Sequence, residues 1–392
     1  MKVMKRINGW STKKKILVLI CLTIIVHTTL IIVDTYGVSQ TTFFGEQSKI
    51  KCDLYRYASR AETVLRGDLL YRDIHTETPP LISYLFMIPT AFSSSALSFQ
   101  MFLSFFNLCT ILLLFCALRD TDENLAFISG LLYLFIPLTT DTAVFVIQDE
   151  PIVSFFFLLP VVLMRWKKRT YAAVIIGLGI WIKAFPLLLL PILLIKDKKW
   201  KERLLHLGII AGLSFLIILP YIILCPDEFF EFLRFYIVGK EGVKGISFWR
   251  FGVYEYLGDS GRISLAILVG GMGVVYAWLY KAKKSVWKSC LIVLCAFFIL
   301  YRKIHSNYFL YPLALLTPFH FMDKGIRWRM WAMIVVVFSL QPYAGSIGLD
   351  ILPFMPVILS MLLIVLLLSL IHKIVKTPSD IPDYSTISLI SK

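Results

Sequence analysis

The chain alternates between long apolar runs and short polar or charged segments. The first apolar run covers residues 16–33 behind a basic N-terminus, and comparable runs recur as far as residue 372. As a helix, a run of about 18 residues or more can cross ~30 Å of hydrocarbon. The runs lack the two-residue alternation of a β-barrel strand, so they predict helices. We therefore expect an all-α, polytopic membrane protein.

About ten spans and one broken hairpin account for these runs. The hairpin covers residues 171–196 and is expected to be re-entrant, because both of its flanks are basic and Pro186 interrupts it close to Lys183. No polar segment is long enough for a soluble domain, so we expect residues 1–392 to form a single membrane domain. The predicted spans are 16–33, 98–118, 124–141, 151–165, 204–224, 263–280, 286–301, 307–322, 328–348 and 351–372.

Residues 49–80 differ from the rest of the chain because they are dense in charge and tyrosine. They lie in the loop 34–97 between the first two predicted spans and read KIKCDLYRYASRAETVLRGDLLYRDIHTETPP. Apolar residues at helical spacing over 50–66 predict an amphipathic helix on the membrane surface, with Gly67 as its stop. Residues 81–92 are too short to span and predict a second, interfacial helix.

Charge gives the orientation. The formal net charge is +15, and only 17% of the residues are charged against 58% hydrophobic. Basic segments such as 165–170 and 196–203 concentrate on one predicted side, which the positive-inside rule assigns to the cytoplasm. We therefore expect a multi-pass protein of the cell membrane with both termini, including the tail 373–392, in the cytoplasm. The basic character is explained as an orientation signal, so no nucleic-acid partner is expected.

Two of the seven cysteines, Cys52 and Cys225, fall in predicted outer loops. No cysteine has zinc-ligand spacing. A disulfide between these two is open on an oxidising face.

The unusual polar residues gather on the predicted outer face, in loops 34–97, 141–150, 225–262 and 301–306. Ionisable groups beside a bilayer are costly, so such a cluster suggests a site. Asp53 can act as a general base toward a sugar or lipid hydroxyl. The alternative is that it only caps the start of its helix.

Two further segments carry candidate groups. Asp149 and Glu150 precede a predicted span; they can hold substrate hydroxyls or a metal, or they can simply be the acidic first turn of a helix. Lys183, inside the apolar hairpin, can bind a phosphate or extend its ammonium to the interface.

The later outer loops supply cations suited to a phosphate or pyrophosphate, interleaved with glycines in 225–262. Their spacing matches no P-loop or dinucleotide motif. Solvated or interfacial side chains are the alternative reading. The cationic candidates are Lys240, Lys244, Arg250, Arg302, Lys303 and His305.

The first outer loop carries a recognisable pattern. It reads Asp53-Leu54-x-x-Tyr57-Ala58, then Leu65-x-Gly67-x-x-Leu70-Tyr71, then Thr78-Pro79-Pro80-Leu81. This pattern resembles the multispanning glycosyltransferases of the C superfamily. It is most similar to the polyprenol-phosphate-mannose-dependent α-mannosyltransferases, and the resemblance spans about residues 10–320.

The resemblance implies an inverting transfer of a hexose, mannose in these relatives, from a polyprenyl-phosphate sugar to a lipid, glycan or protein acceptor. Asp53 would be the base, Tyr57, Asp149 and Glu150 would contact the acceptor or substrate, and the later cations together with Lys183 would hold the phosphate. Some relatives have Asp-x-Asp where this chain has Lys51 at the first position. The resemblance therefore implies chemistry without a metal, and no cofactor.

Two rival functions remain open. A flippase or transporter of lipid-linked sugars would need charges along a path through the membrane and often has an internal repeat. A glycan ligase or polymerase would use a polyprenyl-pyrophosphate donor and usually carries a larger late outer loop than 225–262.

Overall fold

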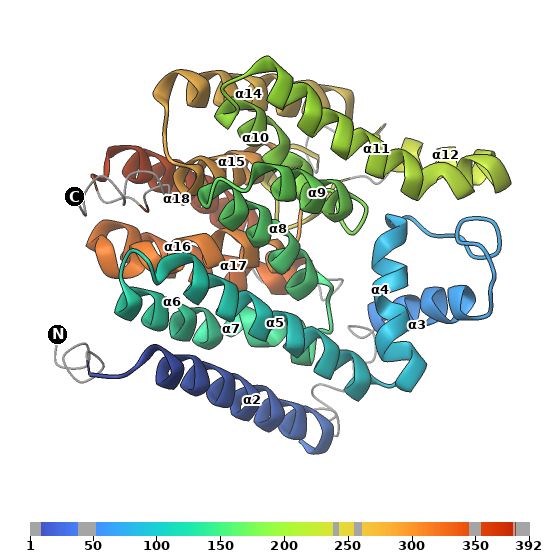
Figure 1. Ribbon diagram of the computed structural model, residues 1–392, viewed down its shortest axis with the longest axis horizontal. Helices are drawn as coiled ribbons and strands as arrows, with labels where there is room; N and C mark the ends of the chain where they lie inside the picture. Colours follow the sequence, from blue (N-terminus) through green and yellow to red (C-terminus); the bar gives the residue numbers. More distant parts are fainter. Residues whose placement is uncertain are drawn as a thin grey trace. The chain divides into compact units, whose positions relative to one another are not determined.

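The computed structural model is about 82% helical, and the expectation of an all-α membrane protein is confirmed. It describes residues 9–37, 52–237, 243–254, 261–344, 354–378 and 381. Contacts divide the chain into two compact units (Figure 1). Unit 1 comprises Met1–Leu187 and Lys199–Phe229, and unit 2 comprises Leu188–Lys198 and Phe230–Lys392.

Unit 1 is built from helices joined by short turns. The long α2, α5 and α6 pack against one another, and α8, α9 and α11 continue the arrangement (Figure 1). Its elements are α2 (Thr12–Tyr36), α3 (Cys52–Leu65), α4 (Pro80–Phe92), α5 (Ala96–Leu118), α6 (Glu123–Phe135), α7 (Pro137–Thr140), the π-helix η3 (Asp141–Phe145), α8 (Glu150–Arg165), α9 (Arg169–Ile180) and α11 (Trp200–Leu224).

Unit 2 adds a second helical group and two very short strands. Helices α17 and α18 pack side by side, and α18 also contacts α15. Its elements are α10 (Leu190–Lys196), β1 (Lys244–Gly245), the π-helix η5 (Trp249–Tyr254), α14 (Gly261–Ala282), α15 (Val286–Leu300), β2 (Lys303–Ile304), the 3₁₀-helix η6 (Ser306–Phe309), α16 (Leu310–Met322), α17 (Lys324–Ala344) and α18 (Met355–Lys376). The 3₁₀-helix η4 (Phe185–Leu189) and α12 (Pro226–Ile237) each cross the boundary between the units.

Five of the described helices are long and apolar enough to cross a membrane: α2, α5, α11, α14 and α18. A sixth candidate is the pair formed by α6 and residues Pro137–Phe145, which meet at a bend of 64°. The chain is therefore a multi-pass membrane protein, while the count of about ten spans stays a prediction. Breaks fall at proline in two places, before Pro137 and at Pro186, because proline removes a backbone donor from the helix.

Helix α2 presents a buried stripe with polar members to its neighbours. His27 and Asp34 are almost fully buried. The Asn107 amide of α5 lies 3.2 Å from His27 Nε2 and donates to the Thr139 carbonyl at 2.7 Å. Near the N-terminal end of α5, the Gln100 side-chain amide donates to the Asp34 carboxylate at 2.7 Å. Buried polar groups need partners, so these bonds fix how α2 packs on α5 and on the bend after α6.

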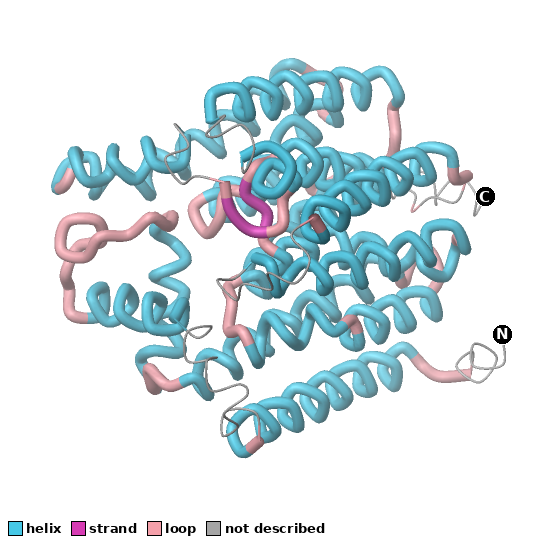
Figure 2. Tube along the Cα trace, turned by 180° about the vertical axis from the view of Figure 1, so that it is seen from behind, coloured by secondary structure: helices cyan, strands magenta, loops and turns pink. Residues whose placement is uncertain are grey.

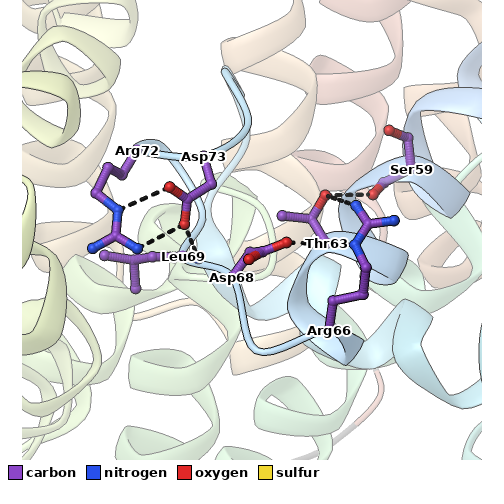
Figure 3. A network of polar contacts seen from close by, with 7 residues as sticks. All are labelled: Ser59, Thr63, Arg66, Asp68, Leu69, Arg72 and Asp73. Carbon is purple, nitrogen blue, oxygen red and sulfur yellow. Dashed lines mark hydrogen bonds and ion pairs between the residues drawn. The ribbon is translucent and has the colours of Figure 1, made fainter.

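The loop between α3 and α4 is closed by a carboxylate (Figure 3). Helix α3 ends at Leu65, and Gly67 follows with a φ of 87°, a left-handed conformation that suits glycine and confirms the predicted stop. The Arg72 guanidinium donates two bonds to Asp73, whose other contact is the backbone N–H of Leu69 at 2.7 Å. These hydrogen bonds lower the pKa of Asp73 to about 2, so its carboxylate is ionised at neutral pH and accepts from both Arg72 and Leu69.

The same loop is anchored to two other parts of unit 1. The buried Tyr71 ring packs edge-on against Tyr221 and Phe229, and its hydroxyl donates to the Thr78 carbonyl at 2.8 Å. At the start of α4, the backbone N–H of Leu81 donates to the Trp181 carbonyl at 2.9 Å. The helix predicted over residues 81–92 is thus present as α4, and its first turn is bonded to the end of α9, while its interfacial location stays a prediction.

Cys225 is a buried free thiol whose Sγ lies 3.8 Å from the Leu70 carbonyl oxygen. The disulfide that the sequence left open between Cys52 and Cys225 is therefore not formed. The side chain of Cys52 is outside the described part of the chain.

In unit 2, β1 and β2 pair in parallel, with Lys244 opposite Lys303 and Gly245 opposite Ile304 (Figure 2). Gly245 has a φ of 76°. A Cβ on it would lie 1.9 Å from the Ile304 carbonyl oxygen. Only glycine allows this close approach of β1 to β2.

We predict that Gly245→Ala lowers the unfolding temperature of the purified protein. The left-handed backbone and the clash with Ile304 together correspond to about 1–3 kcal/mol of unfolding free energy. Gly208→Ala in α11 is the matched control, since its Cβ would meet nothing within 4 Å and alanine favours a helix over glycine by about 1 kcal/mol. Equal unfolding temperatures for the two variants, measured in detergent, would contradict the role of the β1–β2 pair.

Candidate active site

Asp53 lies in the first turn of α3, facing the turn before α8. Its Oδ2 accepts a hydrogen bond from the Gln148 side-chain amide at 2.8 Å, and its Oδ1 lies 3.3 Å from the mostly exposed Arg56 guanidinium. Both of these contacts are made with side chains, one of them 95 residues away in the chain. Asp53 therefore does more than begin its helix. It links α3 to the acidic turn, the segment at the start of α8 that carries Asp149 and Glu150.

Tyr57 lies one helical turn after Asp53 and is buried. Its ring stacks on Phe86 of α4 with centroids 4.5 Å apart, and its hydroxyl donates to the Gln148 side-chain carbonyl at 3.4 Å. Burial raises the pKa of Tyr57 well above its ordinary value, so the hydroxyl stays protonated and acts as a donor. In this structure the hydroxyl is directed at Gln148.

The turn that presents Gln148 has an unusual backbone. The π-helix η3 follows the bend at Pro137, and Ile147 then adopts a φ of 52° although it is buried and β-branched. Such a conformation is strained, and strain of this kind gathers at functional sites. The backbone N–H of Gln148 donates to the Thr142 carbonyl at 2.8 Å, which fixes the turn.

Lys183 pairs with both carboxylates of the acidic turn. Its Nζ lies 2.6 Å from Asp149 Oδ1 and 2.7 Å from Glu150 Oε1. The predicted break is present, because α9 ends at Ile180 and the Lys183 backbone N–H bonds back to the Gly179 carbonyl. One ammonium against two carboxylates leaves this trio with a formal charge of −1 when all three are ionised.

Glu150 is the most buried member of the trio, and its Oε2 has no partner among the described residues. It precedes the predicted span 151–165. Burial raises the pKa of Glu150 to about 7, although the Lys183 ammonium opposes this shift. Burial thus favours the protonated form of this carboxyl group, and the Lys183 ammonium favours the ionised form.

Four predicted site residues surround Tyr57, because the charges of Asp149, Asp53, Lys183 and Glu150 all act on its hydroxyl. Unit 1 thus brings together Asp53, Tyr57, Asp149, Glu150 and Lys183. The sequence analysis assigned no role to Gln148 and missed its bond to Asp53. No local pattern reveals that bond, since α3 and the turn meet only in the folded protein.

The cationic candidates lie in unit 2. The β1–β2 pairing places Lys244 opposite Lys303. The Arg250 guanidinium donates to the Gly245 carbonyl at 3.1 Å, and the Arg302 carbonyl accepts from the Ser247 hydroxyl at 2.6 Å. His305, two residues after Lys303, packs edge-on against Tyr308.

Segments 244–250 and 302–305 therefore form one local group of cations joined by backbone and side-chain bonds. Lys240 and Lys51 lie outside the described residues. The sequence separated these segments into two loops, and the short parallel pairing that joins them was not predicted.

The apolar helices and the cluster of carboxylates around Lys183 describe a membrane protein with a polar site. A family profile described as Glycosyltransferase family 87 matches residues 78–311, more than half of the chain. The chain belongs to glycosyltransferase family 87. The matched region contains the acidic turn, Lys183 and the unit 2 cations, whereas Asp53 and Tyr57 precede it. A comparison with curated proteins found no match.

Membership of this family makes the protein a glycosyltransferase, so the transporter reading is set aside. The resemblance to a polytopic glycosyltransferase is confirmed at that level.

We predict that Lys183→Met destabilises unit 1. Removing one partner of a buried ion pair leaves uncompensated charge and typically costs about 3 kcal/mol of unfolding free energy or more. Because burial raises the pKa of Glu150, the folded variant binds a proton more tightly than the unfolded chain. Its stability should therefore recover as the pH falls from 7 toward 5.

Chemical denaturation in detergent across that pH range measures this effect. Lys199→Met, at an exposed position, is the matched control, and the double variant Lys183→Met/Glu150→Gln should regain part of the loss. A Lys183→Met variant that unfolds like the control at every pH would contradict the buried pairing.

Proposed function

We propose that the protein transfers a hexose, mannose in the first instance, from a polyprenyl-phosphate sugar to a lipid, glycan or protein acceptor on the outer face of the cell membrane. The observation that carries this proposal is the Asp53 carboxylate held by Gln148 at 2.8 Å, beside the paired acidic turn. Family membership supports glycosyl transfer. A membrane-lipid donor suits a chain that is mostly membrane helix, because such a donor reaches the site by lateral diffusion.

The proposed chemistry is a single displacement. Asp53 accepts the proton of the acceptor hydroxyl as the hydroxyl oxygen attacks the anomeric carbon. The new carbon–oxygen bond forms as the bond to the phosphate oxygen breaks, and polyprenyl phosphate leaves with the electron pair. Attack opposite the leaving group inverts the anomeric configuration, and the proton passes from Asp53 to water after the product departs.

The cations of unit 2 are proposed to hold the donor phosphate. Lys244, Arg250, Arg302, Lys303 and His305 are grouped by the β1–β2 pairing and its adjoining bonds, and Lys240 is added from the sequence. Guanidinium and ammonium donors stabilise the charge that develops on a leaving phosphate.

Asp149 and Glu150 are proposed to hold substrate hydroxyls, with Lys183 compensating their charge. This pairing leaves Lys183 less suited to the phosphate role that the sequence suggested for it. The proposal includes membrane lipids as surroundings, cytoplasmic termini and no cofactor, metal or nucleic-acid partner.

We predict that Asp53→Asn abolishes transfer. Loss of a general base typically lowers the rate by about 10²–10⁴-fold. The assay uses purified protein in lipid vesicles, radiolabelled polyprenyl-phosphate mannose or glucose, and a membrane-lipid extract as acceptor. Release of polyprenyl phosphate accompanies each transfer, while a pyrophosphate product would favour the ligase or polymerase alternative.

Asp68→Asn is the matched control. Asp68 follows the same helix, and among the described residues its carboxylate makes an exposed pair with Arg66 at 3.4 Å, so this variant should keep the wild-type rate. Equal transfer by Asp53→Asn and Asp68→Asn would overturn the assignment of the base. Absence of transfer by the wild type from every polyprenyl-phosphate sugar would overturn the donor class.

A further inference from the structure

We infer that Gln148 is a positioning residue that orients the Asp53 carboxylate, and that Tyr57 fixes the orientation of Gln148. This inference rests on the proposed function, since it assigns a role to a residue beside the proposed base. It reassigns Tyr57, which the sequence placed in contact with the substrate, to a role that acts through Gln148.

The hydrogen-bond directions admit one orientation of the Gln148 amide. The protonated Tyr57 hydroxyl donates to Oε1, and Nε2 donates to Asp53 Oδ2 at 2.8 Å. A flipped amide would place its carbonyl oxygen against the carboxylate, which can only accept hydrogen bonds. The Asp53 carboxylate therefore selects the orientation in which Nε2 faces it, and the Tyr57 hydroxyl holds the amide there by donating to Oε1.

Both ends of this chain of contacts are held in place. On one side, Tyr57 stacks on Phe86, whose ring packs in turn against Phe99 of α5 at 5.4 Å between centroids. On the other side, the Gln148 backbone is bonded to Thr142 and follows the left-handed Ile147. The amide consequently has little freedom to leave Asp53.

The arrangement leaves the two oxygens of Asp53 in different states. Oδ2 accepts the hydrogen bond from the Gln148 amide, whereas among the described residues Oδ1 contacts only the Arg56 guanidinium. Arg56 is mostly exposed, and an exposed ion pair constrains its partner weakly. Oδ1 is thus the oxygen presented to an acceptor hydroxyl.

A neutral donor suits this purpose better than a cation would. A charged hydrogen bond to Oδ2 would stabilise the carboxylate and make it a poorer base. An amide instead aligns the group while adding no net charge. The Lys183 ammonium pairs with Asp149 and Glu150, and the Arg56 guanidinium contacts Oδ1 and not Oδ2.

Three variants test the inference in the transfer assay described above. Gln148→Met keeps the approximate side-chain volume but removes both polar groups, and should lower kcat by about 10²-fold, the scale of a misplaced reacting group, with the donor KM within about twofold of wild type. Gln148→Glu keeps an acceptor for Tyr57 but opposes Asp53 with a like charge, and should lower kcat similarly. Tyr57→Phe keeps the ring stacking and should lower kcat less.

Double variants separate positioning from a general structural role. In an Asp53→Asn background, Gln148→Met should not reduce the residual transfer further, because the residue acts only through Asp53. In a Gln148→Met background, Tyr57→Phe should likewise have no added effect. A side chain needed merely for folding would lower transfer in every background and would lower the unfolding temperature as well.

The outcomes distinguish this inference from the function on which it rests. Loss of transfer in Asp53→Asn together with a wild-type kcat in Gln148→Met overturns the positioning role and leaves the base in place. Full transfer by Asp53→Asn overturns the base and the positioning role together. If Gln148→Met fails to fold, Tyr57→Phe decides, since a wild-type kcat in this variant overturns the role of the Tyr57–Gln148 bond.

Discussion

A single ammonium between two buried carboxylates governs the local geometry of unit 1. Lys183 stands where α9 breaks, and Asp149 and Glu150 stand where α8 begins. None of the three charges is tolerable alone in so apolar a setting, because desolvation of an unpaired ion costs several kcal/mol. Their pairing requires the break in one helix to face the start of another. These ion pairs therefore fix the end of α9 against the start of α8, and the positions of the neighbouring residues follow from that contact.

The same ion pairs also fix the position of Gln148. It adjoins Asp149 in sequence, and the strained Ile147 on its other side sends it toward α3. Adjacent residues of one turn thus make different kinds of contact. Lys183 compensates one of the two charges of Asp149 and Glu150, and the uncharged Gln148 amide donates to Asp53. The buried polar stripe of α2 and α5 follows the same logic, because its amides satisfy carbonyl groups around the bend at Pro137.

The sequence predicted what depends on local pattern. Hydrophobic periodicity located α3, the short apolar run 81–92 located α4, and Pro186 located the break beside Lys183. It could not predict the left-handed Ile147, since a β-branched residue argues against that conformation and only tertiary contacts enforce it. The bond between Gln148 and Asp53 was equally hidden, because it joins segments 95 residues apart. Strands of two residues, such as β1 and β2, are too short to show the alternation of apolar and polar residues that predicts a strand. The grouping of the unit 2 cations therefore also required the structure.

The bond from the Leu81 N–H to the Trp181 carbonyl has a mechanical consequence. It ties the first turn of α4 to the last turn of α9, two residues before Lys183. Helix α4 in turn carries Phe86, against which Tyr57 rests. Helix α4 therefore contacts both arms of the candidate site: the end of α9 beside Lys183, and the ring of Tyr57 beside Asp53. A displacement of α4 would act on both contacts at once.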